Sequence, residues 1–197
     1  MKKTIILMAL VVIVSVSVSA QGFYFDVGAG VGKGWTKIDG IDFAKEIKKE
    51  GSIEETGVEF GLKAGFGPFG NIPLYVVADF SGLGHRIADS YNYIQFNSFL
   101  IGPGVIFYPI PLLQLGASVG YSWVSNITDI RGLTFYKSDS GFAWNAYFAF
   151  DLGGDKTGCL VGVKYSYANN KLETSNVDQN SQHVGVFARF AVRKKIA

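Results

Sequence analysis

Apolar and non-apolar residues alternate at eight places along this chain, each time over roughly ten positions. The segment 58–66 (VEFGLKAGF) shows the pattern clearly: Val58, Phe60, Leu62, Ala64 and Phe66 are apolar, and the residues between them are charged or glycine. Successive side chains of a β-strand point to opposite faces, so such a segment places its apolar side chains on one face. An aromatic-rich apolar face of this length is typical of strands that cross a lipid bilayer.

The segments and their connections predict a topology. The predicted strands are 22–36, 55–67, 73–84, 92–108, 113–124, 142–152, 159–168 and 182–192. The connections 68–72, 109–112 and 153–157 are short, whereas 37–54, 85–91, 125–141 and 169–181 are mostly longer and more polar. Short turns that alternate with longer loops are typical of outer-membrane barrels. The predicted fold is therefore all-β: a closed eight-stranded antiparallel up-and-down transmembrane β-barrel.

The fourth strand departs from the simple pattern. Ile94 and Phe96 lie in one phase of the alternation, and Ile101 and Val105 lie in the other. An extra residue in one strand shifts this phase, so we expect a β-bulge near 98–100.

The first twenty residues predict a secretory signal peptide. A basic start at Lys2 and Lys3 precedes an apolar run and the small residues Ser19 and Ala20, so we expect cleavage after Ala20. The apolar run is short for a retained membrane helix, the alternative interpretation. Residues 21–197 then form one barrel domain with a short basic C-terminal tail. This part has 16 basic and 16 acidic residues, so its charge gives no reason to expect nucleic-acid binding.

Two other folds are possible for this pattern. The segment 99–113 has no polar side chain, but Pro103, Pro109 and Pro111 would break a spanning helix. A soluble exported barrel or sandwich with its apolar face turned inward is the other alternative. The non-apolar face of 22–36 carries four glycines between positions 28 and 34, which a crowded interior explains better than water does. Aromatic residues also fall near both ends of the apolar face, as in the girdles at membrane interfaces: Phe23, Trp35, Phe66, Trp123, Trp144, Phe150, Tyr167 and Phe190.

On these features the chain resembles the eight-stranded outer-membrane barrel superfamily, which includes the OmpA barrel domain, OmpX and OmpW-like proteins. The family's last strand carries an assembly signal that His183, Gly185, Ala188 and Phe190 match. Residues 191–197 follow Phe190, whereas family members commonly end on the aromatic residue. The resemblance implies a monomeric, multi-pass protein of the bacterial outer membrane that the barrel-assembly machinery inserts. It also implies possible ligands at the outer loops.

Seven charged residues fall on the face predicted to line the lumen. They are Asp26, Glu59, Lys63, Asp79, Asp151, Lys164 and Arg189. An eight-stranded barrel is just wide enough for its side chains, so we expect these four acids and three bases to pair as a structural plug. The leading functional hypothesis is a closed barrel with a structural or surface-interaction role. An OmpW-like channel for hydrophobic or small polar solutes remains the alternative.

Catalysis and cofactor binding have weaker support. His85, Asp89 and Ser90 form a local cluster of the residue types that lipid-modifying barrels use, but their order does not match the acyltransferase pattern. His183 is expected to be an inward polar residue. Two distant histidines and the lone Cys159 predict no metal site, and no cofactor is expected. The charged first loop is expected to be solvated, with a short helix over 42–50.

Overall fold

The computed structural model describes residues 20–48, 52–89, 92–128, 138–172 and 177–193. The predicted signal peptide therefore lies almost wholly outside the described residues. Within them, no helix is both long and apolar enough to cross a membrane.

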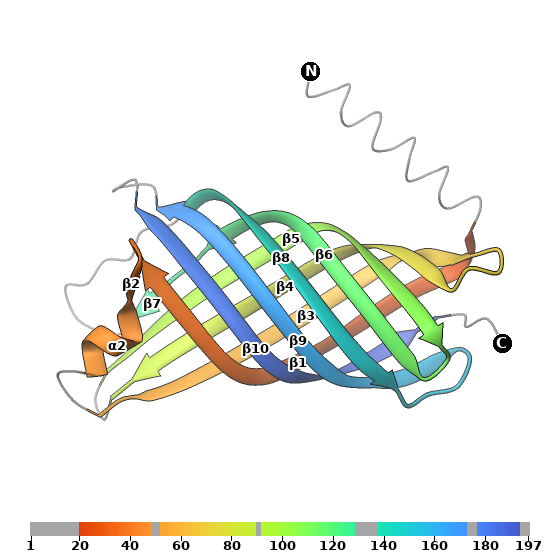
Figure 1. Ribbon diagram of the computed structural model, residues 1–197, viewed down its shortest axis with the longest axis horizontal. Coiled ribbons are helices and arrows are strands. Elements are labelled where there is room, and N and C mark those ends of the chain that lie inside the picture. The colour runs from red at the N-terminus through yellow and green to blue at the C-terminus, as the bar shows by residue number, and fades with distance from the viewer. Residues whose placement is uncertain (1–19, 49–51, 90–91, 129–137, 173–176, 194–197) are drawn as a thin grey trace, which may run out of the picture.

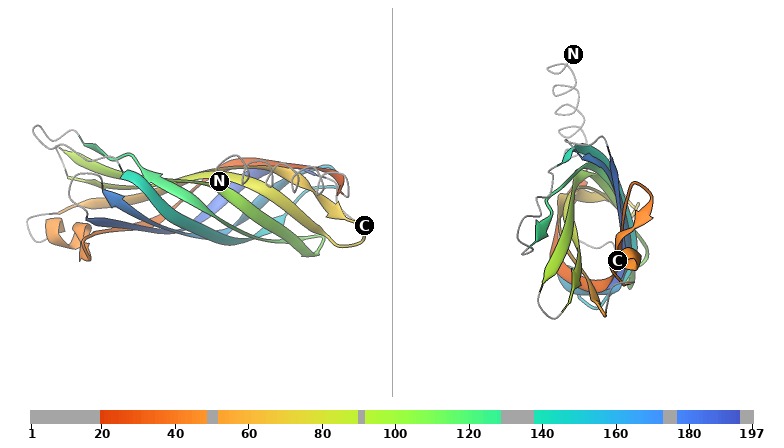
Figure 2. Two further views of the ribbon diagram at one scale, coloured as in Figure 1. Left: turned by 90° about the horizontal axis from the view of Figure 1, so that it is seen from above. Right: turned by 90° about the vertical axis from the view of Figure 1, so that its left-hand side faces the viewer.

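Eight long antiparallel strands form a closed ring, which confirms the predicted fold class (Figures 1 and 2). Each long strand pairs with the next one along the chain. β10 then closes the ring on β1 through a continuous register from Phe25 opposite Val192 to Ile38 opposite Gln179. The long strands are β1 (Ala20–Ile38), β3 (Glu54–Phe69), β4 (Leu74–Ala88), β5 (Tyr93–Ile110), β6 (Leu113–Val124), β8 (Ser138–Asp151), β9 (Thr157–Leu172) and β10 (Asp178–Val192).

The two ends of the barrel differ. The β3–β4, β5–β6 and β8–β9 turns lie at one end, together with the start of β1 and the end of β10 (Figure 1). We call this the turn end. The opposite end, here the loop end, carries the short strands β2 (Ile41–Asp42) and β7 (Ile127–Thr128) and the helix α2 (Phe43–Lys48). The expected helix in the first loop is thus present and begins at Phe43, one residue later than expected, while residues 49 and 50 lie outside the described residues.

Side chains alternate between an apolar outer wall and a mixed interior. On β3, Val58, Phe60 and Leu62 point outward and are exposed, whereas Glu59 and Lys63 point inward and are buried. The outward positions are apolar, aromatic, cysteine or glycine within 23–31, 58–66, 74–82, 99–107, 113–123, 142–150, 159–167 and 184–192. Segments of about nine to eleven residues match the length that a tilted strand needs to cross a bilayer.

The expected β-bulge at 98–100 is wrong. The register between β4 and β5 is continuous from Leu74 opposite Phe107 to Ala88 opposite Tyr93. Ile94 and Phe96 instead point inward, where they pack with Ala44 of α2. The register shift on β5 lies between Phe107 and Ile110, next to the turn to β6. The apolar residues of the fourth strand change phase in the sequence because the lumen is lined by apolar side chains at its loop end on the β4–β5 side.

Some predicted loops are shorter in the structure. β4 continues to Ala88, so His85 belongs to a strand and not to a loop. β9 extends to Leu172 and β10 begins at Asp178, which shortens the fourth loop. β1 also continues to Ile38. Several strands therefore extend beyond the apolar band at the loop end, where their outward residues become polar.

Candidate functional site

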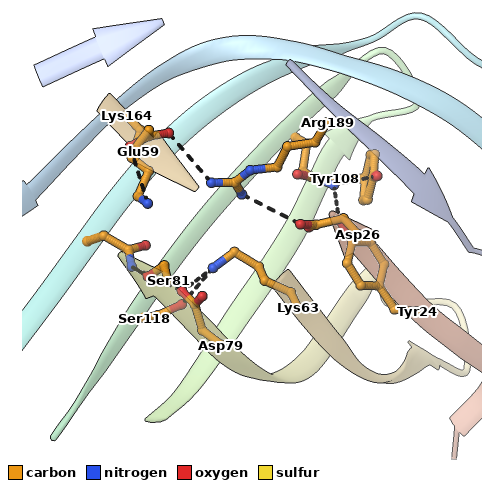
Figure 3. Close-up of polar contacts among 12 residues, drawn as sticks. Tyr24, Asp26, Glu59, Lys63, Asp79, Ser81, Tyr108, Ser118, Lys164 and Arg189 are labelled. Carbon is orange, nitrogen blue, oxygen red and sulfur yellow. Dashed lines mark hydrogen bonds and ion pairs between the residues drawn. The ribbon is translucent and has the colours of Figure 1, made fainter. Parts of the chain in front are cut away.

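The lumen holds charged side chains from six strands. The structure places all seven predicted lumen charges inside, each with at most 4% of its surface exposed. Four of them form the centre of Figure 3, where chains from facing walls point toward one another: Glu59, Lys63, Asp79 and Arg189. Burial of this depth is costly for a charge unless an opposite charge compensates it.

Lys63 and Asp79 form one ion-paired group across neighbouring strands. Their side chains are fully buried and in direct contact. Lys63 Nζ also donates to Ser118 Oγ of β6 at 3.2 Å, and Asn145 Nδ2 of β8 donates to Asp79 Oδ2 at 3.0 Å. The group therefore ties β3 and β4 to β6 and β8 across the lumen.

Glu59 and Arg189 form the centre of a second group. Glu59 Oε2 lies 3.3 Å from Lys164 Nζ, and Glu59 Oε1 lies 3.9 Å from Arg189 Nη2. Arg189 Nη1 is 3.8 Å from Asp26 Oδ1, and the Asp26 carboxylate accepts a hydrogen bond from Tyr24. Each acid in this group thus has at least one base within ion-pair distance, so no large uncompensated charge remains to attract an ion.

Inward glycines make space for the large side chains on neighbouring strands. Gly28 lies opposite Arg189 and Gly61 opposite Gly28, and the Arg189 guanidinium passes within 3.2 Å of the place a Gly61 Cβ would occupy. Gly116 lies opposite Tyr147, whose ring fills the space above it. The glycines of the sequence pattern therefore accompany a filled lumen.

Toward the turn end the interior is aromatic. Tyr24, Tyr75 and Tyr108 pack together, with neighbouring ring centroids 5.2 and 5.9 Å apart. Gln114 Nε2 donates to the hydroxyls of Tyr24 and Tyr108 at 3.0 and 2.6 Å. This cluster fills the lumen between the Lys63 and Glu59 groups and the turn end.

Arg193 provides a fourth inward base that the sequence analysis missed. It was assigned to a basic tail, but β10 continues to Val192 and Arg193 is buried beside Asp151, with which it forms an ion pair. Arg189, Ala191 and Arg193 are spaced by two residues, so all three side chains fall on the inward face of the strand. This spacing is the sequence signal that predicts an inward Arg193. With Arg193 included, four buried acids face four buried bases among these lumen residues.

The loop end of the lumen contains both histidines. His85 Nδ1 is 3.1 Å from Thr36 Oγ1, and His85 Nε2 is 3.6 Å from Glu55, which also pairs with Lys48 of α2. The Thr36 hydroxyl, the His85 imidazole and the Glu55 carboxylate are arranged in the order of a nucleophile, its general base and the group that orients that base. The Thr36 hydroxyl is fully buried, however, so a substrate cannot reach it in this arrangement.

Of the predicted cluster of His85, Asp89 and Ser90, the two described residues are not brought together. His85 points into the barrel, Asp89 accepts a hydrogen bond from the Asn92 backbone at 2.7 Å, and Ser90 lies outside the described residues. His183 is inward, as expected, and its Nδ1 lies 3.6 Å from Glu59. Above the histidines, Ala44, Ile87, Ile94 and Phe96 form an apolar cluster that covers the loop end of the lumen on the β4–β5 side.

The other predicted residues occupy the wall of the barrel. Of the proposed assembly signal, His183 and Gly185 point inward, and Ala188 and Phe190 point outward. The eight girdle residues all point outward. At the turn end Phe23 contacts Phe66, and toward the loop end Trp144 stacks on Tyr167 with the ring centroids 6.2 Å apart.

Two hollows among the described residues differ in size and position. A void of about 10 Å³ next to Ser98 and Lys164 has room for about one water molecule. A hollow of about 510 Å³ lies mainly over the outer wall, where Pro103, Ala117 and Ala146 have small side chains. Among the described residues, no three His, Cys, Asp or Glu side chains are grouped to hold a metal ion.

Comparisons with known proteins show the fold. No family model matches the chain, and no curated relative matches it by sequence. The solved structure of Ail, the attachment invasion locus protein of Yersinia pestis, is 18% identical with a TM-score of 0.52, covering 85% of this chain and 99% of that one. Neisserial surface protein A is 16% identical with a TM-score of 0.51, covering 87% and 96%. Both are small eight-stranded outer-membrane β-barrel proteins, so this chain has their fold.

Proposed function

We propose that this chain, which has the fold of the small eight-stranded outer-membrane barrels, is a closed, non-catalytic barrel of the bacterial outer membrane. It spans the membrane with its eight long strands, and the loop end faces the outside. Its role is structural or is exerted through surface interactions at that end. We further propose that the barrel-assembly machinery inserts it as a monomer and that the aromatic girdles mark the two interfaces.

The observation that carries the closed state is the pairing of the buried charges. Asp26, Glu59, Asp79 and Asp151 each have a basic partner within 4 Å. A hydrated conduction path would leave such side chains in contact with water, whereas here they are nearly inaccessible. The tyrosine cluster toward the turn end and the apolar cluster toward the loop end fill more of the lumen on either side of the Lys63 and Glu59 groups.

The surface role has two supports. Several strands extend past the apolar band at the loop end and carry polar outward residues there, so a rigid polar rim is available for contacts. The structural neighbours are named as an attachment invasion protein and a surface protein, and Ail was crystallised with a heparin analogue, sucrose octasulfate. We therefore propose an extracellular ligand for this chain, bound at the rim or the loops.

Single-channel recording tests the closed state. We expect refolded protein in planar bilayers to give no steady conductance, because paired side chains fill the lumen. A gel-mobility change on boiling would verify that the same sample is folded. Stable current steps that change size in Arg189→Gln would contradict the closed barrel, since the current would then pass the lumen charges.

A further inference from the structure

The first loop is joined to the lumen by a chain of polar contacts at the loop end of the barrel. The chain begins at Thr36 Oγ1, which lies 3.1 Å from His85 Nδ1, and continues from His85 Nε2 to Glu55 Oε2 at 3.6 Å. The other oxygen of the Glu55 carboxylate contacts the ammonium of Lys48, the last residue of α2. One carboxylate therefore faces both an imidazole inside the barrel and a lysine on the helix of the first loop. We call these four residues the His85 chain.

Burial decreases along the His85 chain from the lumen to the solvent. Thr36 and His85 are fully buried, whereas the side chains of Glu55 and Lys48 are 15% and 53% exposed. On β4 the outward apolar segment ends at Gly82, so His85 lies beyond the part of the wall that crosses the membrane. The His85 chain thus links a buried imidazole to the solvent at the mouth of the barrel.

The helix α2 depends on tertiary contacts. It has six residues, and isolated helices of this length are not stable in water. Ala44 is buried in the apolar cluster of β4 and β5, and the Phe43 ring meets the Phe96 ring edge to face at a centroid distance of 5.1 Å. The Lys48–Glu55 pair adds a polar contact at the other end of the helix. A modest change in the free energy of docking is therefore enough to release α2.

The geometry around His85 suits a neutral imidazole. Nδ1 faces the Thr36 hydroxyl, which can donate a hydrogen bond to it, so the proton of the neutral ring lies on Nε2, toward Glu55. A second proton on Nδ1 would force this hydroxyl to turn and accept instead. The distance of 3.6 Å to Glu55 is longer than a hydrogen bond, so the carboxylate would compensate the added charge only in part.

The groups that surround His85 do not offset the cost of charging it. Glu55 on β3, Asp42 on β2 and His183 on β10 are the titratable groups that act on it, and β1 and β5 present the neutral Thr36 and Phe96. Each of the two carboxylates already pairs with a lysine of α2. Burial lowers the pKa of His85, and the neighbouring Glu55 opposes this shift only in part.

The sign of the pH dependence follows from this shift. A histidine in water has a pKa of about 6.5. His85 takes up its proton at a lower pH while α2 is docked, so the docked state binds fewer protons than a released state in which water reaches the imidazole. The free energy of docking is therefore fully present above about pH 6.5 and is lost as the pH falls from there toward the pKa of the docked state.

We propose that the His85 chain is an acid-sensitive latch, which holds α2 on the loop end of the barrel at neutral pH and releases it when the outer medium becomes mildly acidic. Release would uncover the apolar cluster of β4 and β5 at the mouth of the barrel. The inference depends on the loop end facing the outside and does not depend on whether the lumen conducts.

Methyl NMR of the refolded protein in detergent micelles tests the latch. With alanine and isoleucine methyl groups labelled, cross-relaxation between Ala44 and the isoleucines of its cluster reports docked α2. We expect these methyl contacts to weaken about twofold or more between about pH 7.5 and about pH 5, a range that spans the usual pKa of histidine. His85→Gln should lose this pH response, because glutamine is polar but does not titrate.

The matched control is His183→Gln. It removes the other lumen histidine and leaves all four residues of the His85 chain in place. We expect its methyl contacts to respond to pH as in the wild type, with heat-dependent gel mobility showing that each variant is folded. A response that persists in His85→Gln or disappears in His183→Gln would overturn the proposal, as would wild-type contacts that stay constant down to about pH 5. Single-channel recording reports the lumen separately, so failure of the latch and failure of the closed barrel are distinguishable.

Discussion

Lys63→Met is expected to lower the free energy of unfolding by about 3–5 kcal/mol, because it removes one partner of a fully buried ion pair. Asp79 would then keep its charge in the lumen with a hydrogen bond from Asn145 but without its contacting cation. Urea unfolding of the refolded barrel in lipid vesicles, followed by Trp fluorescence, measures the loss.

Two further variants separate the pair from simple truncation. Lys63→Met/Asp79→Asn should be more stable than Lys63→Met alone, since the buried charge is removed while the Asn145 contact is retained. Lys45→Met removes a lysine that is 78% exposed and pairs with Asp42 at 3.5 Å, so its effect should stay below about 1 kcal/mol. A Lys63→Met barrel as stable as the Lys45→Met barrel would show that the buried pair does not stabilise the fold.

Gly28→Val is expected to destabilise the closure of the ring by about 3 kcal/mol or more, at or beyond the upper end for overpacked sites. A Cβ at Gly28 would lie 2.6 Å from Arg189 Cα and would also clash with the Ala188 carbonyl oxygen. Both are backbone atoms of β10, so β1 and β10 would have to move apart at this position. Gel mobility without boiling, combined with protease protection in vesicles, reports the folded fraction.

Gly154→Val is the matched control for this substitution. Gly154 lies in the β8–β9 turn, and a Cβ there would meet no atom within 4 Å. The control should fold like the wild type. Equal folded fractions for Gly28→Val and Gly154→Val would mean that the seam tolerates a larger separation of β1 and β10 than the structure shows.

The alternation of side chains made most of the barrel predictable. Side chains of a strand alternate between its two faces with a period of two residues, and in a closed ring one face lies outside while the other lines the lumen. The outward and inward residues of seven strands could therefore be assigned from the sequence. The fourth strand departs from the prediction because Ile94 and Phe96 are apolar and yet point inward. Their partner, Ala44 of α2, is distant in the sequence, and no local pattern announces that contact.

The pairing of the buried lumen charges was also only partly predictable from the sequence. The sequence could assign four acids and three bases to the interior, and this imbalance left one acid without a base. Arg193 resolves it by pairing with Asp151, because β10 continues two residues beyond Phe190 and turns the next residue inward. His85 likewise became a lumen residue only because β4 is longer than its apolar band.

The sequence by itself determined the number of strands, their order and the side of each that faces outward, because these follow from periodicity and from the lengths of the connections. Only the tertiary structure decided which charges meet, where the lumen changes from charged to apolar, and how Glu55 links His85 to α2 at the loop end. The physical reason is that side-chain pairing depends on register and on contacts across the ring. These join residues separated by most of the length of the chain.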